Sequence, residues 1–463
     1  MSKMKPISIE LHNSSSTSMY IQLYDYLKGE ITCGDMAAGE KLPSLRSISK
    51  SLGVSITTVE MAYNQLLVEG YVISKPQSGY YVAKLSAGVG AGNRADDAAV
   101  DFENYPFEDA RYKYDLSSFD FGKWKKCMSE VLNYYSHLLL FESDPQGEQV
   151  LRFEISKYVY SSRGVICTPD QIVISAGTQQ LTNHLSRIMN RLNIGHVATE
   201  DPGYLPVQKI FRDHGFTITK IPVAADGIAI EKLPVNIPSA VYVSPSNQFP
   251  TGSVMPIGRR YELLDWAAAN NSIILEDDYD SELRYFGRPV PALQGLDKKS
   301  NVVYFGSFSS TLFPAIKISY MILPQKMAGI FSETKGDYDQ TCSKEEQLTL
   351  ALFMEKGYYY TGIRKLRNLY AQKLQTVLTA FNKYAKGFVT PLNTSSGINI
   401  TLRVTTKIPP EVLSSRAGSI GLHVAPVAML TDQDTAALIF YYNQIPLEDI
   451  ETSIQSMIEL WQH

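Results

Sequence analysis

The feature of this sequence that most restricts its fold is an interruption at residues 86–100 of an otherwise ordinary globular chain. The segment reads SAGVGAGNRADDAAV, so it holds small and polar residues without an apolar period, which is the composition of a flexible linker. A chain of 463 residues also exceeds what one ordinary core can hold. We therefore expect two domains, at residues 17–85 and 101–463, joined by a linker at 86–100.

Composition and targeting features exclude several classes of protein. The formal net charge of −4 argues against a chain that coats nucleic acid or membrane by bulk attraction, although a small domain can carry a local field. No apolar run is long enough to cross a bilayer, and MSKMKPISIE lacks the hydrophobic stretch of a signal peptide. The four cysteines form no CxxC pair, and the seven histidines show no metal-ligand spacing. We expect a cytoplasmic chain with no metal and no membrane partner.

The first domain has the pattern of three helices. Apolar residues recur at helical spacing from Tyr20 to Ile31. Ser44 can cap a second helix that Gly53 ends, and Ser55 can cap a third. The third helix is apolar along one stripe and largely polar on the opposite face. The outward-facing set is Thr57, Thr58, Glu60, Met61, Asn64 and Gln65.

A short helix, a turn with glycine and a second helix with a polar N-terminal face form a helix-turn-helix, whose second helix enters the major groove of DNA. Two short strands at 71–74 and 80–82, on either side of a turn at 75–79, would form a wing. Small helical folds mimic this pattern, so the pattern alone leaves DNA binding open.

The same residues resemble a known family. The segment that begins GEKLPSLRSISK and ends KPQSGYYVA is similar, over nearly its whole length, to the winged DNA-binding domain of GntR-type regulators. The resemblance implies that the turn, the start of the third helix and the wing touch phosphates and base edges of double-stranded DNA. The residues it places there are Ser44, Arg46, Ser55, Thr57, Thr58, Gln77 and Gly79.

Two departures bear on DNA binding. Ile56 stands where family members usually carry arginine directly after the serine of the turn. Residues 1–85 hold eight Lys or Arg against seven Asp or Glu, so this domain is nearly neutral. Affinity for DNA should therefore depend less steeply on salt than in a basic winged helix. A winged helix that no longer binds DNA, or binds it only as a dimer, is the alternative.

The second domain alternates apolar segments such as QIVIS, SAVYVS, SIILED and NVVYFG with helical stretches, which predicts an α/β fold with a mostly parallel sheet. Thr178 and Gln179 open a helix after QIVIS, where backbone N–H groups can hold a phosphate. Tyr204 could stack on a ring and Asn247 could donate to a ring hydroxyl. Taken singly, each of these segments is more often a turn with packing residues.

The segment IILEDDYDSE is more specific, because a buried strand that ends in several carboxylates is costly unless each has a partner. The alternatives are a metal site or a cofactor cation. A carboxylate that faces a pyridine nitrogen keeps it protonated, which makes pyridoxal phosphate an electron sink.

From about residue 115 onward, the chain resembles the fold type I, class I aminotransferase domain of the MocR subfamily of GntR regulators. DPQGEQVLR, GTQQ, EDPGY, QFPTG, EDDYDSE and FGSFSSTLFPAIKISYMILP follow that family's order. The resemblance implies an N-terminal winged helix-turn-helix and a C-terminal α/β pyridoxal-phosphate-dependent transferase-like domain with a smaller C-terminal lobe.

The resemblance also assigns roles around the cofactor. Tyr204 would stack on the ring, Asp277 would pair with the pyridine nitrogen, and Asn247 and Tyr279 would lie near the phenolic oxygen. The residues implied at the phosphate are Thr178, Gln179, Ser307 and Lys317.

Three positions depart from the family where its chemistry is carried out. Ser310 replaces the lysine that bonds covalently to the cofactor, and a hydroxyl can neither form an imine nor act as the amine base. Lys317 replaces the phosphate-binding arginine, which keeps the charge but loses the bidentate fork. Ile439 aligns with the arginine that grips a substrate carboxylate. We therefore expect no catalytic residues and no aminotransferase activity.

Three functions remain open from the sequence. The first is a transcriptional regulator that binds a DNA operator, with a degenerate domain for dimerisation and a small-molecule effector; the resemblance implies a head-to-tail homodimer. The second is a regulator that binds pyridoxal phosphate noncovalently. The third, which Ser310 makes the least favoured, is a working aminotransferase.

Overall fold

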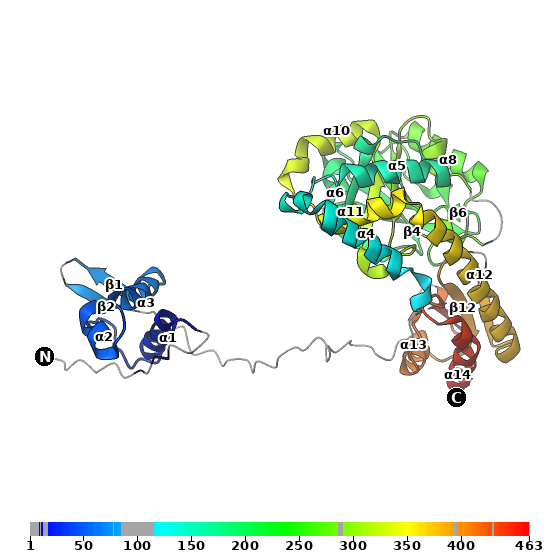
Figure 1. Cartoon of the computed structure of the whole chain (residues 1–463). Coiled ribbons are helices and arrows are strands. Elements are labelled where there is room, and N and C mark those ends of the chain that lie inside the picture. Colours follow the sequence, from blue (N-terminus) through cyan, green and yellow to red (C-terminus); the bar gives the residue numbers. More distant parts are fainter. Residues whose placement is uncertain are drawn as a thin grey trace. The chain divides into compact units, whose positions relative to one another are not determined.

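The computed structural model describes residues 9, 11–12, 17–76, 78–84, 115–285, 290–392, 394, 396–427 and 430–462. The chain divides into two compact units, Met1–Pro106 and Phe107–His463 (Figure 1). The expected linker at 86–100 and the wing residue Gln77 lie outside the described residues, so the linker and this contact stay predictions.

The first unit contains three helices and a two-stranded antiparallel sheet. The polar N-caps form as expected, since Ser44 Oγ accepts the Ser47 N–H at 3.2 Å and Ser55 Oγ accepts the Thr58 N–H at 3.0 Å. Gly53 ends the second helix with φ of +68°, a conformation that favours glycine. The elements are α1 (Met19–Thr32), α2 (Leu45–Leu52), α3 (Ile56–Val68), β1 (Val72–Lys75) and β2 (Gly79–Val82).

One apolar core holds this unit together. Leu27 of α1, Ile48 of α2, Val59 of α3 and Val82 of β2 are all buried in it. The Tyr63 hydroxyl of α3 donates to the Pro43 carbonyl at 3.0 Å, which fixes α3 to the segment that precedes α2. The winged helix-turn-helix fold predicted from the sequence is therefore confirmed.

The second unit is built on an eight-stranded sheet in the order β3-β10-β9-β8-β7-β4-β5-β6. Strands β5, β4, β7, β8 and β9 run parallel, and β10 and β6 pair antiparallel with their neighbours. This agrees with the mostly parallel sheet that the sequence predicts. The strands are β3 (Ile172–Ala176), β4 (His196–Asp201), β5 (Thr217–Ala224), β6 (Gly227–Ile228), β7 (Ser239–Val243), β8 (Ile273–Asp277), β9 (Val302–Ser307) and β10 (Ile318–Ile322).

Helices cover both faces of this sheet (Figure 1). Because side chains alternate along a strand, Ile172 and Ile174 of β3 face one core and Val173 faces the other. The first face is covered by α4 (Phe121–Tyr134), α5 (Gln149–Arg163), α8 (Ile257–Ala269), α9 (Leu293–Leu296) and α11 (Lys344–Glu355). The second face is covered by α6 (Thr178–Arg191), α7 (Leu205–Asp213) and α10 (Gln325–Thr334).

A smaller lobe follows, as the family resemblance implies. The long helix α12 (Tyr358–Tyr384) leads into a four-stranded antiparallel sheet in the order β11-β12-β14-β13. One face of that sheet packs on the helices of the lobe around Leu438 and Phe440. The elements are β11 (Val389–Leu392), β12 (Ile400–Thr405), α13 (Pro410–Ser419), β13 (Val424–Pro426), β14 (Thr435–Phe440) and α14 (Ile450–Gln462).

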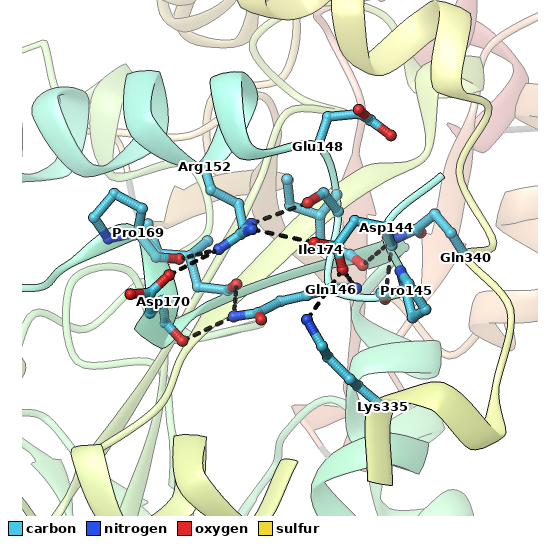
Figure 2. Close-up of polar contacts among 12 residues, drawn as sticks. Asp144, Pro145, Gln146, Glu148, Arg152, Pro169, Asp170, Ile174, Lys335 and Gln340 are labelled. Carbon is cyan, nitrogen blue, oxygen red and sulfur yellow. Dashed lines mark hydrogen bonds and ion pairs between the residues drawn. The ribbon is translucent and has the colours of Figure 1, made fainter. Parts of the chain in front are cut away.

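The DPQG segment before α5 protects the edge strand β3 (Figure 2). The Gln146 carbonyl accepts the Ile174 N–H at 2.9 Å, and the Gln146 side chain donates to the carbonyls of Asp170 and Ile172. The buried Arg152 guanidinium donates to the carbonyls of Gly147 and Pro169 at 2.9 and 2.8 Å. The edge of β3 is thereby covered, which prevents pairing with another chain.

Gly147→Ala tests how tightly the DPQG segment covers the edge of β3. An added Cβ would lie 2.6 Å from Ile174 Cβ, and the φ of +102° is one that other residues rarely adopt. We expect the second unit to lose about 2–4 kcal/mol of stability. Scanning calorimetry of the full chain measures this as a lower melting temperature of that unit. Gly329→Ala is the control, because Gly329 lies in α10 with nothing within 4 Å, and should stabilise by about 0.5–1 kcal/mol. Equal melting temperatures for the two variants would contradict the account.

Candidate functional site

The predicted DNA-contacting residues outside the wing, which are Ser44, Arg46, Ser55, Thr57 and Thr58, lie on one helix-turn-helix. Arg46 of α2 and Thr57 of α3 are exposed, and neither side chain is part of the core. Ser55 Oγ and Thr58 Oγ1 lie 2.8 Å apart, so these two hydroxyls are engaged with each other. Arg46 and Thr57 are therefore the predicted residues whose polar groups are best placed to meet DNA.

The wing carries a basic feature that the sequence prediction missed. Lys41 Nζ and Lys75 Nζ lie 5.8 and 4.4 Å from the centre of the Tyr81 ring, and Ser78 Oγ lies 2.6 Å from the Tyr81 hydroxyl. Hydrogen bonding to Ser78 and the two lysines lower the pKa of Tyr81, although desolvation opposes them. Gly79 pairs with Lys75 across the hairpin. Two ammonium groups beside the wing are candidate phosphate contacts, and the hairpin register together with the isolated bridge between Lys41 and Tyr81 brings them together.

In the second unit, the predicted cofactor residues gather at one edge of the large sheet. Parallel strands end at the same edge, and the antiparallel β10 begins there. Ligands of α/β proteins bind outside this carboxyl edge. Thr178 and Gln179 follow β3, Tyr204 follows β4, and Asn247 follows β7. Asp277 ends β8 and Tyr279 follows it, Ser307 ends β9, and Lys317 precedes β10.

The register places the predicted phosphate residues side by side. Ile318 of β10 pairs with Ala176 of β3, so Lys317 lies next to Gly177 at the start of α6. Ser319 Oγ donates to Ser307 Oγ at 2.9 Å. No side chain caps α6, which leaves the N–H groups of its first turn for an anion. Together these groups can hold a phosphate.

The ring end of the site contains a carboxylate suited to a pyridine nitrogen. Burial raises the pKa of Asp277 to about 6, and the Tyr242 hydroxyl donates a hydrogen bond to it. Asn247 is 4% exposed and accepts a hydrogen bond from Ser396 of the smaller lobe at 3.4 Å. Tyr279 lies against Phe249, with ring centres 6.4 Å apart. These residues fit a phosphorylated pyridine.

The other carboxylates of EDDYDSE have partners that anchor the strand end. Arg163 of α5 makes two hydrogen bonds to the buried Asp278, at 2.7 and 3.0 Å, and a third to Ser246 at 2.7 Å. Glu276 accepts the N–H groups of Leu293 and Gln294 at 2.8 and 3.0 Å. These contacts explain why Asp277, and neither neighbour, is presented to the site.

Ser310 follows β9, and it neighbours Asp280. Burial raises the pKa of Asp280 to about 6, and hydrogen bonds from the Ser310 side chain and the Ile398 backbone oppose that rise. Asp280 is 4% exposed, and its Oδ1 has no hydrogen-bond partner among the described residues. Asp280 was not predicted from the sequence, because only the fold brings it to Ser310.

Ile439 lies on the second face of the small sheet. Leu438 and Phe440 face the core of the lobe, so the alternation turns Ile439 toward Phe249, Val427 and Tyr441. Phe249 in turn contacts Tyr279. Ile439 is thus close to the candidate site and packs in an apolar cluster.

Two family models match this chain. The model "Bacterial regulatory proteins, gntR family" covers residues 19–82, and "Aminotransferase class I and II" covers residues 111–337. The probable rhizopine catabolism regulatory protein MocR of Rhizobium meliloti is 31% identical, over 90% of this chain and 88% of its own length. The chain belongs to the MocR subfamily of GntR regulators.

Other relatives agree with this assignment. The uncharacterized HTH-type transcriptional regulator YdeL of Bacillus subtilis (strain 168) is 38% identical to this MocR-type chain, over 97% of the chain and 98% of the relative. The HTH-type pyridoxine biosynthesis transcriptional regulator PdxR of Corynebacterium glutamicum is 28% identical, over 91% of this chain and 90% of the relative. These relatives are named as regulators of transcription.

Solved aminotransferases share the fold of the second unit of this MocR-type chain. A kynurenine aminotransferase of Pyrococcus horikoshii superimposes with a TM-score of 0.64 at 23% identity, covering 76% of this chain and 89% of its own. LysN, an α-aminoadipate aminotransferase of Thermus thermophilus, superimposes with a TM-score of 0.65 at 20% identity, covering 76% of this chain and 90% of its own. The expected transferase-like fold is confirmed.

The described residues contain neither a metal-binding cluster nor a membrane-spanning helix. Within the described ranges, no group of three or more His, Cys, Asp or Glu side chains is arranged to hold a metal ion. No helix in the described part of this MocR-type chain is both long and apolar enough to cross a membrane.

Proposed function

We propose that this MocR-type chain is a cytoplasmic transcriptional regulator that binds a specific double-stranded DNA operator as a homodimer. The observation that carries the proposal is the polar start of α3, which is capped by Ser55 and exposed at Thr57, together with the exposed Arg46 on α2. Such a helix enters the major groove. The lysines around Tyr81 add phosphate contacts at the wing.

The second unit serves this regulator as a dimerisation and effector domain, with no aminotransferase activity. Ser310 supplies neither an imine-forming amine nor a base for the substrate proton. A groove of about 470 Å³ between α4, α5 and α11 supports dimerisation, because Val150 and Phe153 line it with more than half of each side chain exposed. Large exposed apolar surfaces mark protein interfaces. We expect a second copy of the chain to cover it, in the head-to-tail arrangement of the family.

An effector must bind two arrangements of the dimer with different affinity to regulate transcription. The candidate is a pyridoxal-phosphate-like molecule held reversibly. Asp277, Tyr204 and the phosphate residues Thr178, Ser307 and Lys317 support this, and a relative is named as a regulator of pyridoxine biosynthesis. Occupancy would then follow the concentration of the free ligand.

Arg46→Ala tests the DNA interface. We expect about tenfold weaker binding to an operator selected from random duplex DNA, and a shallower salt dependence by about one unit of slope, because one phosphate contact is lost. Fluorescence anisotropy at several salt concentrations measures both quantities. Lys298→Ala, a charge-matched change in the second unit, should leave both unchanged.

Thr57→Ala should also weaken operator binding, whereas Thr32→Ala at the end of α1 should not. Both threonines are exposed, and the Thr32 hydroxyl bonds only within its own helix, so the pair is matched in chemistry. Failure of the wild-type chain to select any duplex at low salt would refute the proposed function.

A further inference from the structure

The second unit contains a buried carboxylate, Asp280, that forms no ion pair with any side chain among the described residues. Asp280 is 4% exposed, and its Oδ1 accepts no hydrogen bond from the described residues. The groups that oppose the effect of burial on its pKa are the Ser310 hydroxyl and the Ile398 backbone, and neither is a cation. Burying a charged carboxylate without a cationic partner costs free energy. A positively charged group of a ligand beside Asp280 would therefore be favourable.

Asp280 belongs to the candidate cofactor site. Its charge is the largest influence after burial that raises the pKa of both Tyr279 and Tyr441, and it also raises the pKa of Asp277. Asp280 directly follows Tyr279 and comes three residues after Asp277, the last residue of β8, so it belongs to the ring-end segment. Its neighbour Ser310 is shorter than a lysine by several atoms, so the space of that side chain and its positive charge are both missing beside Asp280.

The charges of the site suit a ligand with one anionic and two cationic groups. Lys317 and the start of α6 face a phosphate, and Asp277 faces a protonated pyridine nitrogen. Asp280 is the second carboxylate, and a neutral aldehyde would leave it unpaired. A primary ammonium group on the ring substituent would pair with it and replace the missing lysine charge.

We propose that Asp280 selects the amine form of the cofactor, pyridoxamine phosphate, over the aldehyde form, pyridoxal phosphate, as the reversible ligand of this regulator. The ammonium group of the ligand lies beside Asp280 Oδ1, next to Ser310. This inference rests on the proposed effector role of the second unit, and it adds the chemical class of the effector.

The apolar surroundings of Ile439 further restrict the chemical class of ligand that fits the site. Ile439 packs with Phe249, Val427 and Tyr441, and these side chains offer no charge to a carboxylate. An adduct between the cofactor and an amino acid carries such a carboxylate, and pyridoxamine phosphate does not. The site thus favours the free amine over the amino-acid adduct.

Isothermal titration calorimetry of the full chain tests the inference with three probes: pyridoxamine phosphate, pyridoxal phosphate and N-(5'-phosphopyridoxyl)alanine. We expect pyridoxamine phosphate to bind at least about tenfold more tightly than either of the other two probes. A charge-assisted hydrogen bond in a buried site contributes enough binding free energy for such a ratio of affinities. Asp280→Asn should reduce the preference for the amine over the aldehyde to nearly one. Asp265→Asn, an exposed change on α8, should preserve it.

Several outcomes would overturn the inference. The inference would be overturned if pyridoxal phosphate bound as tightly as pyridoxamine phosphate. It would also be overturned if Asp280→Asn kept the wild-type preference for the amine over the aldehyde. Absence of binding for all three probes would also overturn it. A melting temperature for Asp280→Asn close to that of the wild type shows that the variant is folded. Operator binding by the same preparation separates the two proposals, because it can persist when the ligand preference fails.

Discussion

Arg163→Met should lower the stability of the second unit by about 3–5 kcal/mol, since removing one partner of a buried ion pair leaves an uncompensated charge. Arg163 and Asp278 are both buried, and Asp278 also accepts hydrogen bonds from Tyr304 at 2.6 Å and Ser281 at 3.0 Å. Although burial raises the pKa of Asp278, the Arg163 guanidinium lowers it below its usual value. Loss of the arginine would leave this carboxylate charged without a partner or force it to take up a proton.

Scanning calorimetry of the full chain measures the loss as a lower melting temperature. Arg191→Met is the matched control, because Arg191 is half exposed and lies 3.8 Å from an exposed Glu333. Such a surface pair is worth less than about 1 kcal/mol. Adding Asp278→Asn to Arg163→Met should recover part of the loss. A drop no larger than that of Arg191→Met would mean that this ion pair does not anchor the end of β8.

Ser310→Lys should restore covalent attachment of pyridoxal phosphate, from none in the wild type to about one cofactor per chain. The backbone that leads to position 310 is ordered, with β9 ending at Ser307 and the register to β10 formed. A visible absorbance band that borohydride abolishes, with the cofactor mapped to the peptide around residue 310, measures the gain.

Ser309→Lys is the control for Ser310→Lys, because it adds the same amine one residue away. We expect no stoichiometric attachment there, since imine formation needs close placement of the amine. Attachment in both variants would show that any nearby lysine suffices. Attachment in neither would show that the site no longer accepts the cofactor ring.

Much of the fold could be predicted from short-range patterns. The caps at Ser44 and Ser55 and the break at Gly53 are local chemistry, so the helix-turn-helix follows from sequence alone. The order of strand-end motifs likewise predicts that Asp277 and Lys317 meet at one edge of the sheet. Ile439 could be assigned to the site by alignment, and the alternation along β14 agrees with that assignment.

The residues that were missed depend on contacts between distant segments. Asp280 and Ser310 are thirty residues apart, and nothing in DYDSE distinguishes Asp280 from its neighbours. Its lack of a cation emerges only once Arg163 is seen to pair with Asp278. The two lysines around Tyr81 similarly come from separate segments, since Lys41 meets Tyr81 through an isolated bridge and Lys75 belongs to the hairpin.

The central claim is that this MocR-type chain keeps the aminotransferase site without its covalent chemistry. The most direct test is the intact mass of the wild-type chain after incubation with pyridoxal phosphate and borohydride, with Ser310→Lys as the positive control. We expect no stoichiometric adduct on the wild type and full recovery of the ligand on dialysis. A stoichiometric adduct on a single wild-type lysine, for example Lys317, would contradict the claim.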